Sequence, residues 1–329
     1  MSRAIRFHRV GGPDVLCFED MVVPPPGAGE VRVDVKAIGL NRADASFRSG
    51  RYIEEPKFPA SLGLEAAGIV ESVGEGVNEF VSGQLVGLVP PISMAESPTY
   101  VERANFPARM LVASPPQLDA ASTAALWMAY LTAYGALIDI AGIGRGDAVA
   151  ITAASSSVGI AAIQMANLLG AIPIALTRTG AKARALRELG AREVITTDGP
   201  YVADRLQAAA GGLGVRVVLD AVGGPLIGEI SKAMCCHGQI FEYGGLSSEQ
   251  TPFPLGQALG RQLLMRGYLV HHVTANPGRL ARAEDFIRSG VESGMLRPVI
   301  DKIFPFDRVV DAHRWLEGGH QIGKIVLQV

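Results

Sequence analysis

A short run of serines followed by a glycine is the part of this chain whose residue types suit phosphate binding. Ser155–Ser157 are followed by Val158 and Gly159. Serine hydroxyls donate hydrogen bonds to phosphate oxygens, and small residues let the backbone approach a phosphate closely. On a G-x-G-x-x-G pattern the three glycine positions hold Ala154, Ser156 and Gly159, so only the last is glycine. The run predicts a phosphate site, and a buried strand–turn–helix without a ligand is the alternative.

The sequence on either side of this serine turn (residues 155–159) determines how the turn would be held. An apolar run over residues 148–153 precedes it, a helical apolar pattern follows, and a second apolar run covers residues 172–176. Strand, tight turn, helix and strand form the first half of a dinucleotide-binding unit. The turn then lies at the amino terminus of a helix, where free N–H groups point at a pyrophosphate. We therefore expect the serine turn to bind a dinucleotide.

The residues that end the second strand predict which dinucleotide binds. An acidic residue about 20 positions after the turn would hold the ribose diol of NAD. This chain has Thr177 and Arg178 there, and Lys182 follows closely. Basic side chains suit a 2′-phosphate, so the sequence favours NADPH. A solvated strand end is the alternative reading of Arg178, because arginine is mostly exposed in proteins.

Strands alternate with helices along the chain after residue 178, which is typical of an α/β fold with a parallel sheet. Residues 268–270 are expected to form a last strand at the sheet edge. Ligands bind such sheets at the carboxyl ends of the strands, so the loops after later strands should join the serine turn around one crevice. The candidate cofactor-binding residues in those loops are Ala221, Val222, Gly244, Gly245 and Leu246.

The first 120 residues have a different pattern, with several short expected strands separated by Gly- and Pro-rich turns. Residues 30–38 alternate apolar and charged side chains, which indicates a half-buried strand. Asn41 is placed to cap a short helix that ends near Gly50. This part of the chain therefore predicts a small barrel-like or sandwich domain. A helix over 280–289 and a strand over 324–328 are expected to close the chain.

The composition fits a protein with two domains and a large core. The chain has 329 residues, 48% of them hydrophobic, and its 30 basic and 32 acidic residues are well mixed. Because no basic tract is present, we expect no nucleic-acid partner. Three cysteines are too few for a disulfide framework and suit a reducing cytoplasm. The first residues lack the apolar core of a signal peptide, so we expect a cytoplasmic protein.

Two long stretches without charged residues imitate membrane spans. They cover residues 120–138 and 148–177, and each reaches the length of about 20 apolar residues that a bilayer requires. The second stretch contains a serine triplet and Pro173, which divide it into three short elements. Buried helices and parallel strands are apolar on all sides, so we interpret both stretches as core and expect no membrane partner.

These residues together resemble the medium-chain dehydrogenase/reductase superfamily, and within it the zinc-free quinone oxidoreductases of the zeta-crystallin-like branch. The matching stretches include KAIGLNRAD, GLEAAGIVESVGEGV, TAASSSVGIAAIQMA, VLDAVGG and the closing GKIVL, and the resemblance spans nearly the whole chain. It implies a Rossmann dinucleotide-binding domain over 123–270 and a mostly β, GroES-like catalytic domain over 1–122 and 271–329. The active site would then lie in the cleft between them.

The resemblance also bears on zinc. Zinc alcohol dehydrogenases of this superfamily have a ligand cysteine where this chain has Asn41, and a ligand histidine where it has Leu64. Residues 89–100 lack the four close cysteines of a structural zinc lobe. A catalytic zinc needs three Cys, His or carboxylate ligands, so we expect no metal and a substrate polarised by hydrogen bonds.

The resemblance assigns roles to individual residues. It places Asn41 and Tyr52 at the substrate, with a helix cap and an exposed aromatic as their respective alternatives. Ser46 replaces a second family tyrosine. Asp44 and Glu65 are interpreted as supporting residues, and no catalytic role is assigned to His271 or His272. Further cofactor-binding residues are expected at Thr132, where a buried helix threonine is the alternative, at Thr197, which replaces a family tyrosine, and at Val270 and Lys324.

The function expected is an NADPH-dependent oxidoreductase that transfers hydride to a small-molecule quinone or α,β-unsaturated carbonyl. An enoyl-thioester reductase on the same fold is an alternative, to which a basic patch of Arg42, Arg48 and Arg51 would contribute. A nucleotide-binding protein with little turnover is another, because zeta-crystallin-like proteins also serve as lens structural or RNA-binding proteins. Residues 263–270 are an apolar stretch expected at the sheet edge, which predicts a homodimer.

Overall fold

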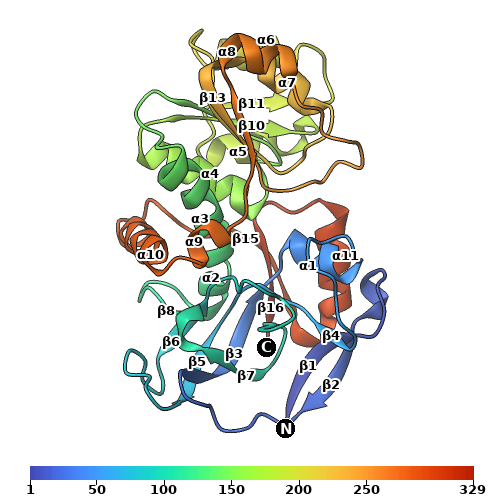
Figure 1. The fold of residues 1–329 in the computed structure, drawn as a ribbon, viewed down its shortest axis with the longest axis vertical. Helices are drawn as coiled ribbons and strands as arrows, with labels where there is room; N and C mark the ends of the chain where they lie inside the picture. The colour runs from blue at the N-terminus through green and yellow to red at the C-terminus, as the bar shows by residue number, and fades with distance from the viewer. The chain divides into compact units, whose positions relative to one another are not determined.

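The computed structural model describes residues 1–329, and the chain divides into two units (Figure 1). Residues 1–128, 274–280 and 298–329 form the terminal unit, which contains both chain ends. Residues 129–273 and 281–297 form the middle unit.

The middle unit contains a six-stranded parallel sheet of the Rossmann type. Its strand order reverses at β9, which lies between β10 and β12, and ligands bind open parallel sheets at such a switch point. All four residues of β9 are buried, as expected for a strand covered on both faces. In spatial order the strands are β11 (Glu193–Thr196), β10 (Ile172–Thr177), β9 (Ala148–Ile151), β12 (Val215–Asp220), β13 (Met234–Glu242) and β14 (Leu264–Gly267).

Short helices connect these strands, as the alternating sequence pattern predicted. The connecting helices are α4 (Ser157–Leu168), α5 (Ala183–Glu188), α6 (Val202–Ala209), α7 (Leu226–Lys232) and α8 (Leu255–Arg261). The core between helices and sheet is aliphatic, with Ile174, Leu206, Val218 and Ile227 among its fully or almost fully buried residues.

Both uncharged stretches are divided into short elements. The first includes α2 (Ala120–Ala124), α3 (Trp127–Tyr134) and a π-helical turn that begins at Gly135, and the second is divided among β9, α4 and β10. None of the helices combines the length and the apolar character that crossing a bilayer would take.

The terminal unit is mostly β and has the GroES-like architecture. Along β3 (Glu30–Gly39) the residues Val31, Val33 and Val35 are fully buried, which confirms the alternation read from the sequence. The larger sheet has the order β15 (Ile300–Pro305), β16 (Lys324–Gln328), β3, β5 (Ala66–Val73), β6 (Leu85–Leu88) and β8 (Leu111–Ala113), and β7 (Arg103–Pro107) pairs with β3. A smaller sheet has the order β2 (Cys17–Met21), β1 (Ser2–Phe7) and β4 (Ala60–Ser61), while α1 (Arg42–Arg48) and α11 (Val309–Gly318) complete the unit.

One expected strand is wrong. Residues 268–270 do not form the last strand, because β14 ends at Gly267 and the chain then enters α9 (His271–Thr274). Tyr268 donates its N–H to the carbonyl of Glu242, and its ring turns inward to pack edge-on against Phe241. The ring of Tyr268 is buried, and the N–H of Val273 donates to the carbonyl of Val270. Both features favour the start of a helix over a longer strand.

Candidate active site

The serine turn of the middle unit is shaped by one cap and one close approach. The Ser156 hydroxyl accepts a hydrogen bond from the N–H of Gly159 at 3.1 Å and so caps α4. A Cβ added at Gly159 would lie 2.5 Å from the carbonyl oxygen of Ala154, so only glycine fits there. Ser155, Ser157 and Val158 are half-buried at the helix start. Of the three glycine positions in the G-x-G-x-x-G pattern, the turn therefore retains the one at which packing requires glycine.

The basic residues predicted to select the cofactor lie at the ends of neighbouring strands. Arg178 is exposed directly after β10, and the structure gives its guanidinium no partner within the chain. Lys182 donates to the hydroxyl of Ser155 at 3.0 Å, which places this ammonium at the serine turn. Thr197, after β11, donates its N–H to the carbonyl of Thr177 at 2.9 Å. Arg178, Lys182 and Thr197 therefore lie around the carboxyl ends of β10 and β11.

The loops after β12 and β13 are tied together at the same edge of the sheet. Leu246 donates its N–H to the carbonyl of Ala221 at 3.1 Å, and the N–H of Val222 is held by Asp220 at 2.8 Å. A Cβ on Gly244 would lie 2.9 Å from the carbonyl oxygen of Ala221. The residues expected there, including Gly245, therefore belong to one group of loops. Thr132 lies buried in α3, and Val270 lies buried just before α9.

The sequence analysis missed a carboxyl group at this edge. Glu242 ends β13, and burial next to the Asp220 carboxylate raises the pKa of Glu242 to about 8. Asp220 is itself fully buried and accepts hydrogen bonds from Thr152 at 2.5 Å and from Gly223 at 3.1 Å. Glu242 is therefore largely protonated at neutral pH. An acidic residue at a strand's carboxyl end was the available sequence signal.

In the terminal unit, Asn41 is held by a buried polar cluster. The Asn41 Nδ2 donates to Glu65 at 3.0 Å and to the carbonyl of Gly39 at 3.2 Å, while Oδ1 accepts from Lys324 at 2.8 Å. Lys324, which is 1% exposed, also forms an ion pair with Glu65. An asparagine amide has two protons to donate, so both of those on Asn41 are used within the chain. Its side chain can therefore offer a substrate only an acceptor.

The cluster continues through Asp44. Its Oδ2 accepts from the backbone N–H of Asn41 at 2.8 Å, which gives α1 its cap, and from the Tyr100 hydroxyl at 3.1 Å. Tyr100 also contacts Nε2 of His313 at 3.2 Å, and the Arg48 guanidinium contacts Nδ1 of His313 at 2.8 Å. Arginine can only donate, so Nδ1 accepts and the proton of a neutral imidazole lies on Nε2.

These hydrogen bonds run in one direction, from Arg48 through His313 and Tyr100 to Asp44. Burial, with the Arg48 charge, lowers the pKa of His313 to about 3, and burial raises the pKa of Asp44 to about 7. Because Arg48 blocks Nδ1, this chain of hydrogen bonds holds Asp44 in place and does not conduct protons. The sequence analysis missed Tyr100 and His313, since they come from segments far apart along the chain.

The Tyr52 hydroxyl, unlike the side chains of Asn41 and Asp44, has no partner within the chain. The half-buried ring packs edge-on against Phe47, with ring centroids 6.3 Å apart. Burial, with the charges of Asp44 and Glu54, raises the pKa of Tyr52 to about 12. The phenol thus stays protonated and free to donate. Ser46, at the position of the second family tyrosine, is half-buried in α1.

One group expected from the sequence, the basic patch of Arg42, Arg48 and Arg51, is not assembled. Arg48 is 1% exposed and pairs with Glu317 at 2.6 Å, so it is wrong to count it in a basic patch with Arg42 and Arg51. His272, to which no catalysis was assigned, pairs with Asp139 of the middle unit at 2.9 Å.

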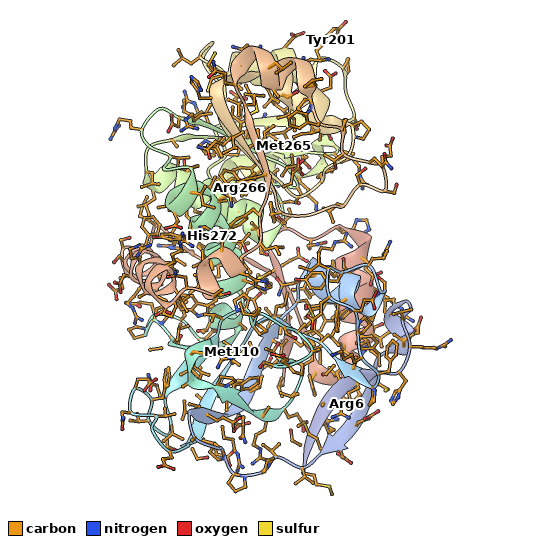
Figure 2. All side chains as sticks on the ribbon, in the orientation of Figure 1. Arg6, Met110, Tyr201, Met265, Arg266 and His272 are labelled. Atoms are coloured by element: carbon orange, nitrogen blue, oxygen red, sulfur yellow. The ribbon has the colours of Figure 1, made fainter.

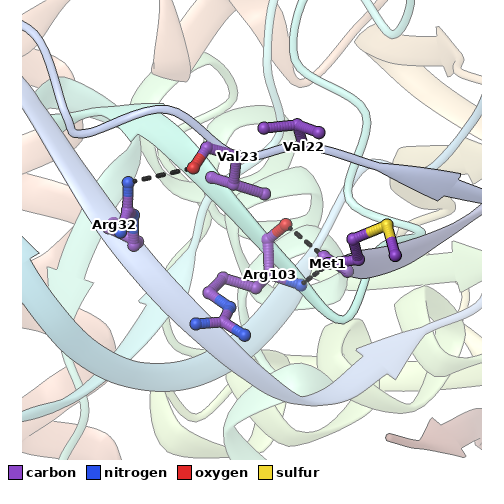
Figure 3. Close-up of a pocket in the computed structure, with 6 residues that line it drawn as sticks. Met1, Val22, Val23, Arg32 and Arg103 are labelled. Atoms are coloured by element: carbon purple, nitrogen blue, oxygen red, sulfur yellow. Dashed lines mark hydrogen bonds between the residues drawn. The ribbon is translucent and has the colours of Figure 1, made fainter.

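Neither of two surface pockets in the terminal unit is lined by a predicted site residue. One, of 140 Å³, is lined by Met1, Val22, Val23, Arg32 and Arg103, among others (Figure 3). The Arg32 guanidinium there donates to the carbonyl of Val23 at 3.2 Å, so it is not free to hold an anion. The other, of 450 Å³, lies beside β5 and contains Glu71 as well as Arg103.

Similarity to known proteins shows the family of the chain. Residues 27–114 match the alcohol dehydrogenase GroES-like domain family, and residues 189–327 match the zinc-binding dehydrogenase family. A 2-haloacrylate reductase from Burkholderia sp is 31% identical over 99% of both chains. The chain belongs to the medium-chain dehydrogenase/reductase superfamily. A quinone oxidoreductase from Rattus norvegicus is also similar, at 29% identity over 99% of this chain and 98% of that one.

Solved structures of this superfamily have the same fold. The crystal structure of Escherichia coli quinone oxidoreductase complexed with NADPH has a TM-score of 0.90 at 30% identity, covering 99% of this chain and 100% of that chain. An NAD-dependent alcohol dehydrogenase has a TM-score of 0.88 at 31% identity, covering 99% of both chains. The chain is therefore an oxidoreductase of the superfamily.

Proposed function

We propose that the protein is an NADPH-dependent reductase of quinones or α,β-unsaturated carbonyls that works without zinc. The observation that carries the proposal is the polar environment of α1. Asn41 and the buried, apolar Leu64 stand where zinc ligands would be needed, and the amide protons of Asn41 are used within the chain. Tyr52 is protonated and has a free hydroxyl. Hydrogen bonding by Tyr52 therefore replaces a Lewis acid in the proposed reaction.

The middle unit has residues that fit the cofactor. Gly159 allows the tight turn that begins α4, a helix amino terminus is where a pyrophosphate binds, and Ser155 and Ser157 add hydroxyls. Arg178 is free to take the 2′-phosphate, with Lys182 beside the serine turn. When bound, NADPH supplies a hydride from its nicotinamide ring, and the protein supplies orientation and electrostatics.

The terminal unit supplies the hydrogen-bond donor that stabilises the negative charge developing on the substrate. Negative charge builds on the carbonyl oxygen as hydride adds to its conjugated system, and a donor already in place stabilises that charge. Tyr52 donates this hydrogen bond, while Asp44, Lys324 and Glu65 hold Asn41 and the start of α1 in position. The final proton then comes from Tyr52 or solvent. The relatives support this substrate class, because quinones and 2-haloacrylates are both conjugated acceptors.

Rapid mixing tests the proposal directly. Protein loaded with NADPH is mixed with a quinone, an enone or an enoyl thioester, and the loss of NADPH absorbance is followed. We expect the quinone or the enone to oxidise the bound NADPH in a single turnover. Oxidation should be slower when NADH replaces NADPH. Faster oxidation by the enoyl thioester would support the alternative reductase, and no oxidation by any acceptor would support a binding protein without turnover.

Catalysis should not depend on metal. Because Leu64 has no ligand atom and the Asn41 Oδ1 already accepts a hydrogen bond from the Lys324 ammonium, we expect protein purified without added zinc to contain well below one zinc per chain. Treatment with a chelator should leave the rate of NADPH oxidation unchanged. Elemental analysis and an assay before and after chelation check both points, and stoichiometric zinc whose removal abolishes activity would contradict the proposal.

We expect the protein to be a homodimer. β14 is the edge strand of the middle sheet, and apolar side chains near it are exposed, Leu264 to 50% and Leu259 of α8 to 72%. An open apolar edge pairs readily with a second copy across a two-fold axis. Light scattering should report the mass of two chains, and Leu259→Glu should shift the particle to one chain. A monomeric wild type would contradict the prediction.

A further inference from the structure

The smaller sheet of the terminal unit brings together a histidine, a cysteine and a glutamate that have no part in the proposed reaction. β1 and β2 are antiparallel, and Arg6 lies opposite Cys17. Directly opposed residues, and residues two apart along a strand, share one face of a sheet. Cys17 and Glu19 therefore share a face with Arg6, and His8 continues that row beyond the end of β1. Arg6 is labelled in Figure 2.

The ligand atoms of these three residues converge. The Nε2 of His8 lies 2.5 Å from an oxygen of Glu19, and the Cys17 thiol completes a group whose ligand atoms all lie within 4.8 Å of one another. The side chain of His8 is 58% exposed and that of Glu19 is 30% exposed, whereas Cys17 is half-buried. An ion can thus reach the group from solvent, while the strands hold two of its members in place.

Arg6 and His8 orient the Glu19 carboxylate and keep it ionised. Arg6 bonds the other oxygen of Glu19 at 3.1 Å, which leaves the first oxygen directed at His8. The hydrogen bond with His8 lowers the pKa of Glu19, so this side chain is ionised. Burial raises the pKa of the Cys17 thiol, which donates to the carbonyl of Arg6 at 3.4 Å. Cys17 is therefore protonated until a metal displaces the proton.

We propose that His8, Cys17 and Glu19 form a binding site for a thiophilic divalent cation, Zn²⁺. A sulfur, an imidazole nitrogen and a carboxylate oxygen form a ligand set that suits zinc, with water in the fourth position, whereas Ca²⁺ and Mg²⁺ prefer oxygen ligands. Binding forms three metal–ligand bonds and releases the thiol proton to solvent. Bonds of about 2.0–2.3 Å require the exposed His8 ring to rotate away from Glu19.

The site should bind zinc more weakly than a structural zinc site does. The Arg6 guanidinium beside Glu19 opposes a second cation, and only three residues of the chain serve as ligands. Because the ion joins β1 to β2, binding should raise the melting temperature of the whole protein. The site is therefore expected to be empty after chelation and to fill when zinc is added.

Co²⁺ can report on binding at this site, because a Co²⁺–thiolate bond absorbs strongly in the near ultraviolet. Full-length protein is stripped with a chelator, freed from the chelator and titrated with Co²⁺. We expect the thiolate band to saturate at one equivalent and to disappear when Zn²⁺ competes. Cys17→Ser should abolish the band, while the matched variant of an exposed cysteine, Cys236→Ser, should retain it. Loss of an outer-shell partner typically costs tenfold or more in metal affinity, so Glu19→Gln, which changes a ligand itself, should weaken Co²⁺ binding at least about tenfold.

Two outcomes would overturn the site. One is the absence of a thiolate band in the wild type, and the other is a band that survives Cys17→Ser. If Cys17→Ser does not fold, the titration of Glu19→Gln decides, because unchanged Co²⁺ affinity in that variant excludes the carboxylate. NADPH oxidation by Cys17→Ser should equal that of the wild type, so a failed metal site remains distinguishable from a failed reductase.

Discussion

Replacing Tyr52 with phenylalanine should lower turnover roughly 100-fold or more, the loss expected when one donor to a developing oxyanion is removed. The Tyr52 hydroxyl has no partner within the chain, and the ring contact with Phe47 is retained by phenylalanine. NADPH affinity and melting temperature should therefore stay close to those of the wild type. Steady-state kinetics with a quinone, a nucleotide titration and a melting curve measure the three quantities.

Tyr201→Phe is the matched control, because Tyr201 is 73% exposed in the middle unit. It should behave as the wild type in all three measurements. The pKa of Tyr52, raised to about 12, also predicts that ionisation of this phenol removes no activity near neutral pH. If Tyr52→Phe turns over normally, Tyr52 is a bystander, and another donor or solvent stabilises the oxyanion.

Local patterns were sufficient to predict much of the fold. The alternation along β3 predicts its buried valines, and the terminal strand begins and ends at Lys324 and Gln328 as expected. Small residues around the serine turn predict a strand–turn–helix. Glycine remains at position 159 because the carbonyl of Ala154 lies too close for a side chain. These features are indicated by patterns of residues close in sequence, even where the strands pair with distant ones. The end of β14 is not, because packing of the Tyr268 ring against Phe241 overrides the strand propensity of residues 268–270.

The state of the polar residues could not be predicted from sequence. Asn41 has the residue type of a hydrogen-bond donor, but Glu65 and Gly39 accept both of its amide protons. Arg48 has the residue type of a surface cation, but His313 and Glu317 hold it inside the terminal unit. Each of these outcomes depends on a partner distant in sequence. The free hydroxyl of Tyr52 could be established only once all such pairs were known.

Replacing Arg178 with alanine should weaken NADPH binding while leaving NADH binding nearly unchanged. Arg178 follows β10 with a guanidinium that has no partner within the chain, and such a group can take two phosphate oxygens at once. A hydrogen bond to a charged group contributes about 1.5–3 kcal/mol, which corresponds to roughly 10- to 150-fold in affinity. NADH lacks the 2′-phosphate, so it loses no contact. Fluorescence titration of both nucleotides against wild type and variant measures the difference.

Three further measurements separate this contact from a general effect of charge. Arg184→Ala is the matched control, because Arg184 belongs to α5, its side chain is 91% exposed and it pairs with Glu188. It should leave both affinities unchanged. Arg178→Lys should recover only part of the loss, since an ammonium keeps the charge but not the paired donors. The difference between wild type and Arg178→Ala should shrink at high salt, where exposed charges are screened. Equal losses for NADPH and NADH would instead show that Arg178 supports the adenine or the fold, and the 2′-phosphate assignment would then fail.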